Sequence, residues 1–243
     1  MNSRGAAGGW LRSRKLVGLR EYVVVWAGSA GAIVVLGHSS DADFARYFGE
    51  TPPLIAVGLV GTAGLAALRT LSSEGWLTAE GMSAFRRGAG SAAKIATMFG
   101  GAILVADRLG RFPEDINVAW PRALLFYPAM GFVAEVVFHL IPLSLFSPLV
   151  RMLTNWDKGQ RSYIIVSIAA VALAEAAFQV FTGGSGDRNR WLSAYLGLHL
   201  LGFGGAQLAV LRKRGFASMA LMRLVYYAIW HILWGRLRLT LLF

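Results

Sequence analysis

Cysteine is absent from this chain of 243 residues. Disulfides, thiol nucleophiles and cysteine-ligated metal sites are therefore excluded. Charged residues are also scarce: they make up 15% of the chain, whereas soluble domains carry about a quarter. Because hydrophobic residues account for 56%, too little polar surface remains to coat a globule in water. The composition predicts an all-α, polytopic bundle of lipid-facing helices, with room for about seven spans of about 20 residues each.

Acidic residues are outnumbered by basic ones, 13 to 24, which gives a formal net charge of +11. The basic residues gather beside apolar runs, as in 12–20 and 212–214, which is typical of topology determinants in membrane proteins. We therefore expect membrane lipid as a partner and no nucleic acid. The distribution of Lys and Arg among the loops predicts a cytoplasmic N-terminus. As the location we expect a bacterial inner (plasma) membrane, crossed several times by the chain.

Apolar runs separated by polar or turn-rich segments divide the chain into three parts. Residues 1–21 form a basic cytoplasmic segment, residues 22–122 form three N-terminal spans, and residues 123–243 form four spans with a short C-terminal tail. The expected spans are 22–36, 54–71, 91–105, 123–146, 162–181, 191–211 and 217–234.

Ionisable and amide side chains concentrate in the last four spans. They are Glu135, His139, Glu175, Gln179, His199, Gln207, Arg223 and His231. A charge at mid-bilayer costs at least about 2.5–3.5 kcal/mol on insertion scales, so such groups usually have a partner or a task. Glu135 and His139 are four residues apart, as are Glu175 and Gln179, so each pair shares one helix face. We expect four helices to direct a carboxylate and imidazoles into one buried cavity suited to acid–base chemistry.

Three segments resemble motifs of the CAAX-protease and bacteriocin-processing (CPBP, or Abi) intramembrane proteases. Residues 134–139 (AEVVFH) resemble the first motif, EExxxR, and residues 200–215 (LLGFGGAQLAVLRKRG) are similar to the family's glycine-rich span with its basic turn. Residues 231–234 (HILW) resemble the third motif, HxxxN. The resemblance covers 123–235 and implies a CPBP-like core of four helices in the C-terminal half.

The motifs are degenerate in this chain. Ala134 stands at the first glutamate, His139 replaces the arginine, and Trp234 replaces the asparagine. The second motif, FxxxH, aligns by span order with 175–179, where Gln179 replaces the histidine; 195–199 is a second possible match. The substitution at Ala134 removes the glutamate that activates water in the family.

The resemblance implies water attack on a peptide bond, with a glutamate activating the water and histidines stabilising the oxyanion. We therefore expect a divergent intramembrane hydrolase, a peptidase acting on a membrane-embedded or lipidated peptide. Only Glu135, as the base, and His231, as its electrostatic partner, carry over from the family. The further candidate catalytic residues are His139, Glu175, Gln179 and His199.

Several alternatives stay open. Glu135, His139 and His231 offer a carboxylate and two imidazoles, a donor set that suits zinc. A second hypothesis is a catalytically inactive CPBP-like scaffold that binds another membrane protein, and a third is a cofactor-binding membrane subunit. Individual residues also have structural interpretations: Glu175 and Arg223 could form one ion pair between two spans, and the histidines could bond neighbouring helices.

Overall fold

The computed structural model describes residues 18–37, 41–77, 81–182 and 190–243, so most of the expected N-terminal segment 1–21 lies outside the described residues. Every regular element within these ranges is helical. Seven of the described helices are long and apolar enough to cross a membrane. The chain is therefore an all-α, multi-pass membrane protein, as its composition predicted.

The spans follow one another with short connections. They are α1 (Leu19–Leu36), α3 (Pro53–Ser73), α4 (Gly81–Gly110), α5 (Ala123–Ala134) continued by η3 (Glu135–Leu140) and α6 (Ile141–Thr154), α7 (Arg161–Thr182), α8 (Arg190–Arg214), and α9 (Phe216–Tyr227) continued by η4 (Ala228–Trp234) and α10 (Gly235–Leu241). Two short helices, α2 (Asp41–Phe48) and η2 (Glu114–Ile116), lie in the connections.

Three spans extend well beyond their predicted bounds. The fourth span continues to Thr154 rather than ending at 146. Helix α4 begins at Gly81 rather than at 91, and its first turns carry exposed Arg86 and Arg87. Span seven continues to Leu241 instead of ending at 234, so the expected C-terminal tail is helical. For these last two spans the predicted bounds exclude arginines, because a charge in lipid is costly. That cost does not apply to an exposed helix end or to an arginine with buried partners, such as Arg238.

The fourth and seventh spans each contain a π-helical turn, η3 and η4. Pro142 lies directly after the first residue of α6. Because proline has no N–H, it cannot continue the regular ladder of backbone hydrogen bonds. The turn before it is widened, and the N–H of Ile141 bonds the carbonyl of Val136. Such turns are often found at functional sites, and η3 carries Glu135 and His139.

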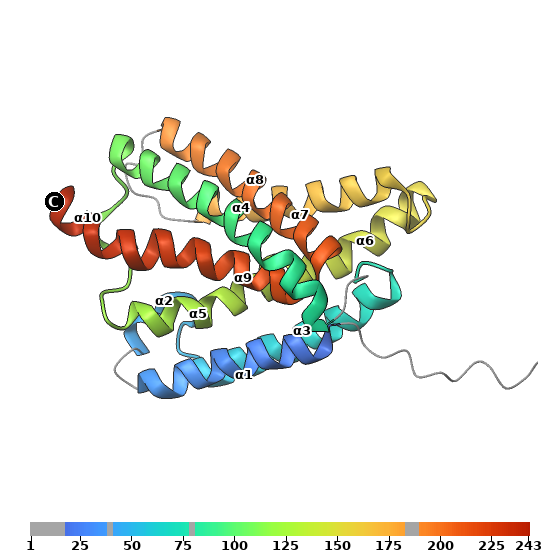
Figure 1. Cartoon of the computed structure of the whole chain (residues 1–243), viewed down its shortest axis with the longest axis horizontal. Coiled ribbons are helices and arrows are strands. Elements are labelled where there is room, and N and C mark those ends of the chain that lie inside the picture. The colour runs from blue at the N-terminus through green and yellow to red at the C-terminus, as the bar shows by residue number, and fades with distance from the viewer. Residues whose placement is uncertain (1–17, 38–40, 78–80, 183–189) are drawn as a thin grey trace, which may run out of the picture.

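The spans are arranged around α9, which packs against α4, α5 and α8 (Figure 1). Helices α1 and α3 lie side by side at one edge of the bundle and pack against the fourth span. Helices α7 and α8 pack against each other on the other side. The fourth to seventh spans therefore meet around η3, where their polar side chains are placed.

Candidate functional site

Five polar side chains from the last four spans converge in the interior of the bundle. They are Glu135 and His139 from η3, Glu175 from α7, Gln207 from α8 and Arg223 from α9. All five are at most 3% exposed. We call these five residues the core cluster. The sequence predicted a carboxylate and several imidazoles in one buried cavity; the structure brings together two carboxylates and one imidazole.

Glu135 is the most strongly bonded member of the core cluster. Its Oε1 accepts a hydrogen bond of 2.8 Å from Arg223 Nε and another from the side-chain amide of Gln207. Its Oε2 lies 2.8 Å from His139 Nδ1. We infer that His139 Nδ1 carries a proton and donates it to Glu135, because the carboxylate contact at 2.8 Å is much shorter than the 3.4 Å contact from Arg223 Nη2 to the same nitrogen. Glu135 thus fixes the orientation and tautomer of His139.

The other ring nitrogen of His139 faces the second carboxylate. His139 Nε2 lies 3.2 Å from Glu175 Oε2, near enough for an ion pair, although the two atoms lack hydrogen-bond alignment. Glu175 Oε1 is held by Arg223 Nη2 at 3.3 Å and by Gln179 Nε2 at 3.2 Å. Two bare acceptors at this separation would repel each other, so we infer that one proton lies on His139 Nε2 or on Glu175 Oε2. With that proton the core cluster is electrically neutral.

Gly204 of α8 lies against the core cluster, next to Glu175 Oε2 and His139 Nε2. A Cβ atom at this position would lie 2.7 Å from Glu175 Oε2 and 3.5 Å from His139 Nε2. The helix backbone therefore approaches the pair so closely that any side chain would displace one of its members. The glycine-rich character of the sixth span, noted in the sequence, serves this close approach.

His199 and His231 bond to other partners. His199 lies between two tyrosines, with Nε2 at 3.1 Å from Tyr226 Oη and Nδ1 at 3.3 Å from Tyr195 Oη. His231 Nδ1 lies 2.6 Å from Asn117 Oδ1, and its ring stacks on Tyr127 with centroids 4.3 Å apart. The structure therefore places Glu135, His139, Glu175 and Gln179 together, and it holds His199 and His231 through contacts outside the core cluster.

The zinc site expected from Glu135, His139 and His231 is not formed. Within the described ranges, no group of three or more His, Asp or Glu side chains is arranged to hold a metal ion. Two features account for this: Arg223 and Gln207 occupy the Glu135 carboxylate, and His231 is bound to Asn117 instead.

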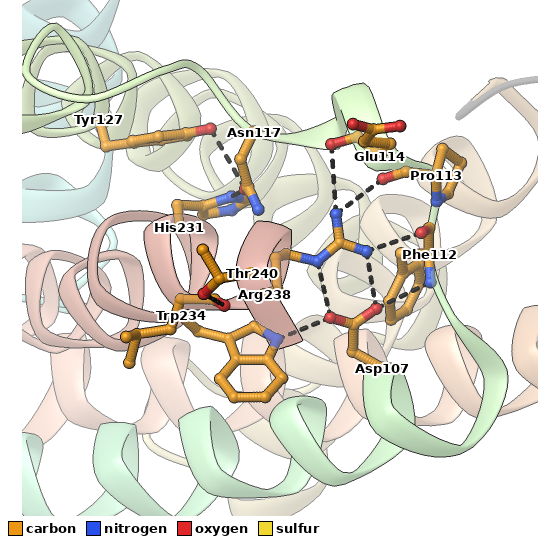
Figure 2. Close-up of polar contacts among 11 residues, drawn as sticks. Asp107, Phe112, Pro113, Glu114, Asn117, Tyr127, His231, Trp234, Arg238 and Thr240 are labelled. Atoms are coloured by element: carbon orange, nitrogen blue, oxygen red, sulfur yellow. Dashed lines mark hydrogen bonds and ion pairs between the residues drawn. The ribbon is translucent and has the colours of Figure 1, made fainter. Parts of the chain in front are cut away.

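A second buried polar cluster lies at the end of the bundle where α4 and α10 meet (Figure 2). Arg238, with no exposed surface, pairs with Asp107 through bonds of 2.8 and 2.9 Å and donates to the carbonyls of Phe112, Pro113 and Glu114. Trp234 Nε1 adds a bond of 2.6 Å to Asp107. We call Asp107, Trp234 and Arg238 the end lock. Because Nε, Nη1 and Nη2 of Arg238 all donate hydrogen bonds, we infer that the end lock stabilises the fold.

The end lock was not predicted from the sequence, since Asp107 falls after the predicted end of the third span and Arg238 falls in the predicted tail. One signal was available: Trp234 and Arg238 are four residues apart and so share a helix face with the preceding apolar run.

The CPBP resemblance finds no independent support. Counted from His231, the asparagine of HxxxN falls on Gly235 rather than on Trp234, which weakens the third motif further. No protein-family model, no curated protein and no solved structure matches the chain.

Proposed function

We propose that this protein is a divergent CPBP-like intramembrane hydrolase, a peptidase, in which the His139–Glu175 pair exchanges a proton with the attacking water. The proposal is supported by one observation: within the protein interior, the His139 ring contacts the Glu135 carboxylate through one nitrogen and the Glu175 carboxylate through the other. One carboxylate orients an imidazole, and the other nitrogen of that imidazole lies 3.2 Å from a second carboxylate. This is the arrangement of groups used for general acid–base catalysis.

In this proposal the base is Glu175 rather than Glu135. Both oxygens of Glu135 are engaged by strong donors, whereas Glu175 Oε2 accepts no hydrogen bond within the described residues. With the shared proton on His139, Glu175 can take a proton from water as the water oxygen bonds the peptide carbonyl carbon. The same proton then passes to the leaving amine as the C–N bond breaks. Arg223 holds the position of both carboxylates throughout.

The substrate class follows from the burial of the site. All five members of the core cluster are covered by protein within the membrane-spanning part of the bundle. A substrate would reach them only when spans separate, as when α7, which carries Glu175, moves away from Gly204 of α8 beside it. A membrane-embedded or lipidated peptide, already dissolved in the bilayer, suits this route.

The test is cleavage of defined peptides by the purified protein in lipid vesicles. Single-span and farnesylated peptides are incorporated, and their products are identified by mass spectrometry. We expect Glu175→Gln to reduce cleavage by at least about 100-fold, the usual range for loss of a general base. Glu74→Gln is the matched control, because Glu74 is also a buried carboxylate paired with an arginine, Arg151 at 3.3 Å, but lies outside the core cluster. Full cleavage by Glu175→Gln would refute the role of Glu175.

A second candidate function is a non-catalytic scaffold for another membrane protein. It is favoured by one observation: the charges of the core cluster compensate each other and join the fourth, fifth and seventh spans, as a purely structural network would. A scaffold predicts no cleavage of any peptide by the wild-type protein. It also predicts that Glu175→Gln lowers partner binding only in proportion to the loss of folded protein, which quantitative co-purification would measure.

A further inference from the structure

A pocket of about 330 Å³ lies away from the core cluster. Its walls come from α2 and from the segment that joins α4 to α5. The polar lining residues are Asp43, Arg46, Tyr47, Asp115, Asn117 and Arg122. The volume is in the range of small-ligand sites, about 300–1,000 Å³, and no core-cluster residue lines the pocket.

The pocket lies at one end of the bundle, where spans enter and leave the membrane. Helix α2 follows the end of α1, and the other wall follows the end of α4 at Gly110. Beside it, Trp120 is 47% exposed and carries the guanidinium of Arg236 over its ring at 5.2 Å. Exposed tryptophan and arginine at span ends are typical of the headgroup region of a bilayer. The pocket therefore faces the depth at which lipid headgroups lie.

The charges of the pocket balance: it is lined by two arginines and two aspartates. Asp43 and Arg122 pair with each other at 2.9 Å and form part of the wall. The Asp115 carboxylate has no hydrogen bond or ion pair with any described residue, and the guanidinium of Arg46 makes only a long hydrogen bond, 3.4 Å, to the Asp115 carbonyl among the described residues. Asn117 belongs to the wall, because its Oδ1 lies 2.6 Å from His231 Nδ1 and its Nδ2 is buried.

The groups left for a ligand are thus a guanidinium and a carboxylate in one pocket. The guanidinium is a donor suited to phosphate oxygens. The carboxylate accepts hydrogen bonds from a primary ammonium, whereas a quaternary ammonium, which has no N–H, is bound by aromatic cages. Together they complement a zwitterion that carries a phosphate and a primary ammonium.

We propose that this pocket binds a phosphoethanolamine group, with Arg46 on the phosphate and Asp115 on the ammonium. At headgroup depth the nearest source is phosphatidylethanolamine of the surrounding bilayer; soluble phosphoethanolamine has the same chemistry. The proposal is independent of hydrolysis in the core cluster, because the two sites share no residue.

The test is lipid competition on the full-length protein. Protein in detergent is offered equal amounts of phosphatidylethanolamine, phosphatidylcholine and phosphatidylglycerol with identical acyl chains, and bound lipids are counted by native mass spectrometry. We expect phosphatidylethanolamine to be retained over both others. Asp115→Asn should lower the ratio of ethanolamine to choline lipid about five-fold, the effect of losing one partly exposed charge contact. Arg46→Gln should lower retention of all three lipids.

Matched controls lie next to the pocket but outside its lining. Glu114→Gln changes the carboxylate adjacent to Asp115, and Arg108→Gln changes an exposed arginine at the same end of the bundle. Both should leave the lipid ratios unchanged. Because all four substituted side chains are exposed, the variants should fold, which size-exclusion chromatography checks.

Addition of soluble phosphoethanolamine distinguishes the two sources of the ligand, the lipid headgroup and the free molecule. Displacement of bound phosphatidylethanolamine supports the lipid headgroup as occupant, and binding of soluble phosphoethanolamine without any lipid preference supports the soluble source. Equal retention of ethanolamine and choline lipids together with no binding of phosphoethanolamine would overturn the proposal. An unchanged lipid ratio in Asp115→Asn would do the same.

Discussion

Arg223 contacts both carboxylates of the core cluster, with Nε on Glu135 and Nη2 on Glu175. Its guanidinium also lies over the rings of Phe203 and Tyr227, at 5.5 and 5.7 Å from their centroids. An arginine suits this position because its planar group can bond two acceptors and stack on aromatic rings at once. The ion pair between Glu175 and Arg223, one of the alternatives left open by the sequence, is confirmed, and Glu135 extends it.

Gly204 offers a test of the core cluster at the scale of one methyl group. In Gly204→Ala the new Cβ would lie 2.7 Å from Glu175 Oε2, a side-chain atom that the cluster holds in place. We expect the variant to lose about 1–3 kcal/mol of unfolding free energy, as overpacked interiors do, and to displace Glu175 from His139. Denaturation in detergent measures the loss.

The neighbouring glycine is the control for this change. A Cβ at Gly205 would meet only Ile168, at an ordinary distance of 3.9 Å. Gly205→Ala should therefore be neutral or stabilising by up to about 1 kcal/mol, because alanine is the better helix former. Equal stability of the two variants would mean that the core cluster tolerates a shift of Glu175.

At the scale of elements, the seventh span connects the three polar sites. Arg223 in α9 belongs to the core cluster, His231 in η4 bonds the pocket residue Asn117, and Arg238 in α10 belongs to the end lock. The π-helical turn η4 lies between the first and the last of these residues. The seventh span therefore connects the interior of the bundle to its end.

The end lock should contribute strongly to stability. Arg238→Gln leaves the buried Asp107 without its cation, and loss of one partner of a buried ion pair costs about 3–5 kcal/mol. Arg236→Gln, two residues away on the exposed face, should cost less than about 1 kcal/mol. Thermal unfolding of both variants in detergent measures the difference, and similar melting temperatures would show that the end lock contributes little.

At the scale of the whole molecule, the orientation in the membrane is open to a direct test. Because the chain contains no cysteine, a single introduced cysteine is a clean reporter for a membrane-impermeant maleimide. With a cytoplasmic N-terminus, Glu50→Cys between α2 and α3 should be labelled on intact cells. Gly159→Cys between α6 and α7 should be labelled only after permeabilisation. The opposite pattern would place the N-terminus outside.

The sequence by itself determined the helical class and the number of spans. Each span satisfies its own backbone hydrogen bonds within lipid, so a long apolar run is sufficient to predict it. The pairing of Glu135 with His139 and of Glu175 with Gln179 was predictable for the same reason, because residues four apart meet on one helix.

Only the tertiary structure decided which helix faces meet. Placing Gln207 and Arg223 on Glu135 requires the rotations of the sixth and seventh spans about their axes, which depend on packing between distant segments. The bonds from Asn117 to His231 and from Asp107 to Arg238 depend on how the connection between α4 and α5 folds over the end of the bundle. Such contacts join residues more than one hundred positions apart, and no local pattern of residue types specifies them.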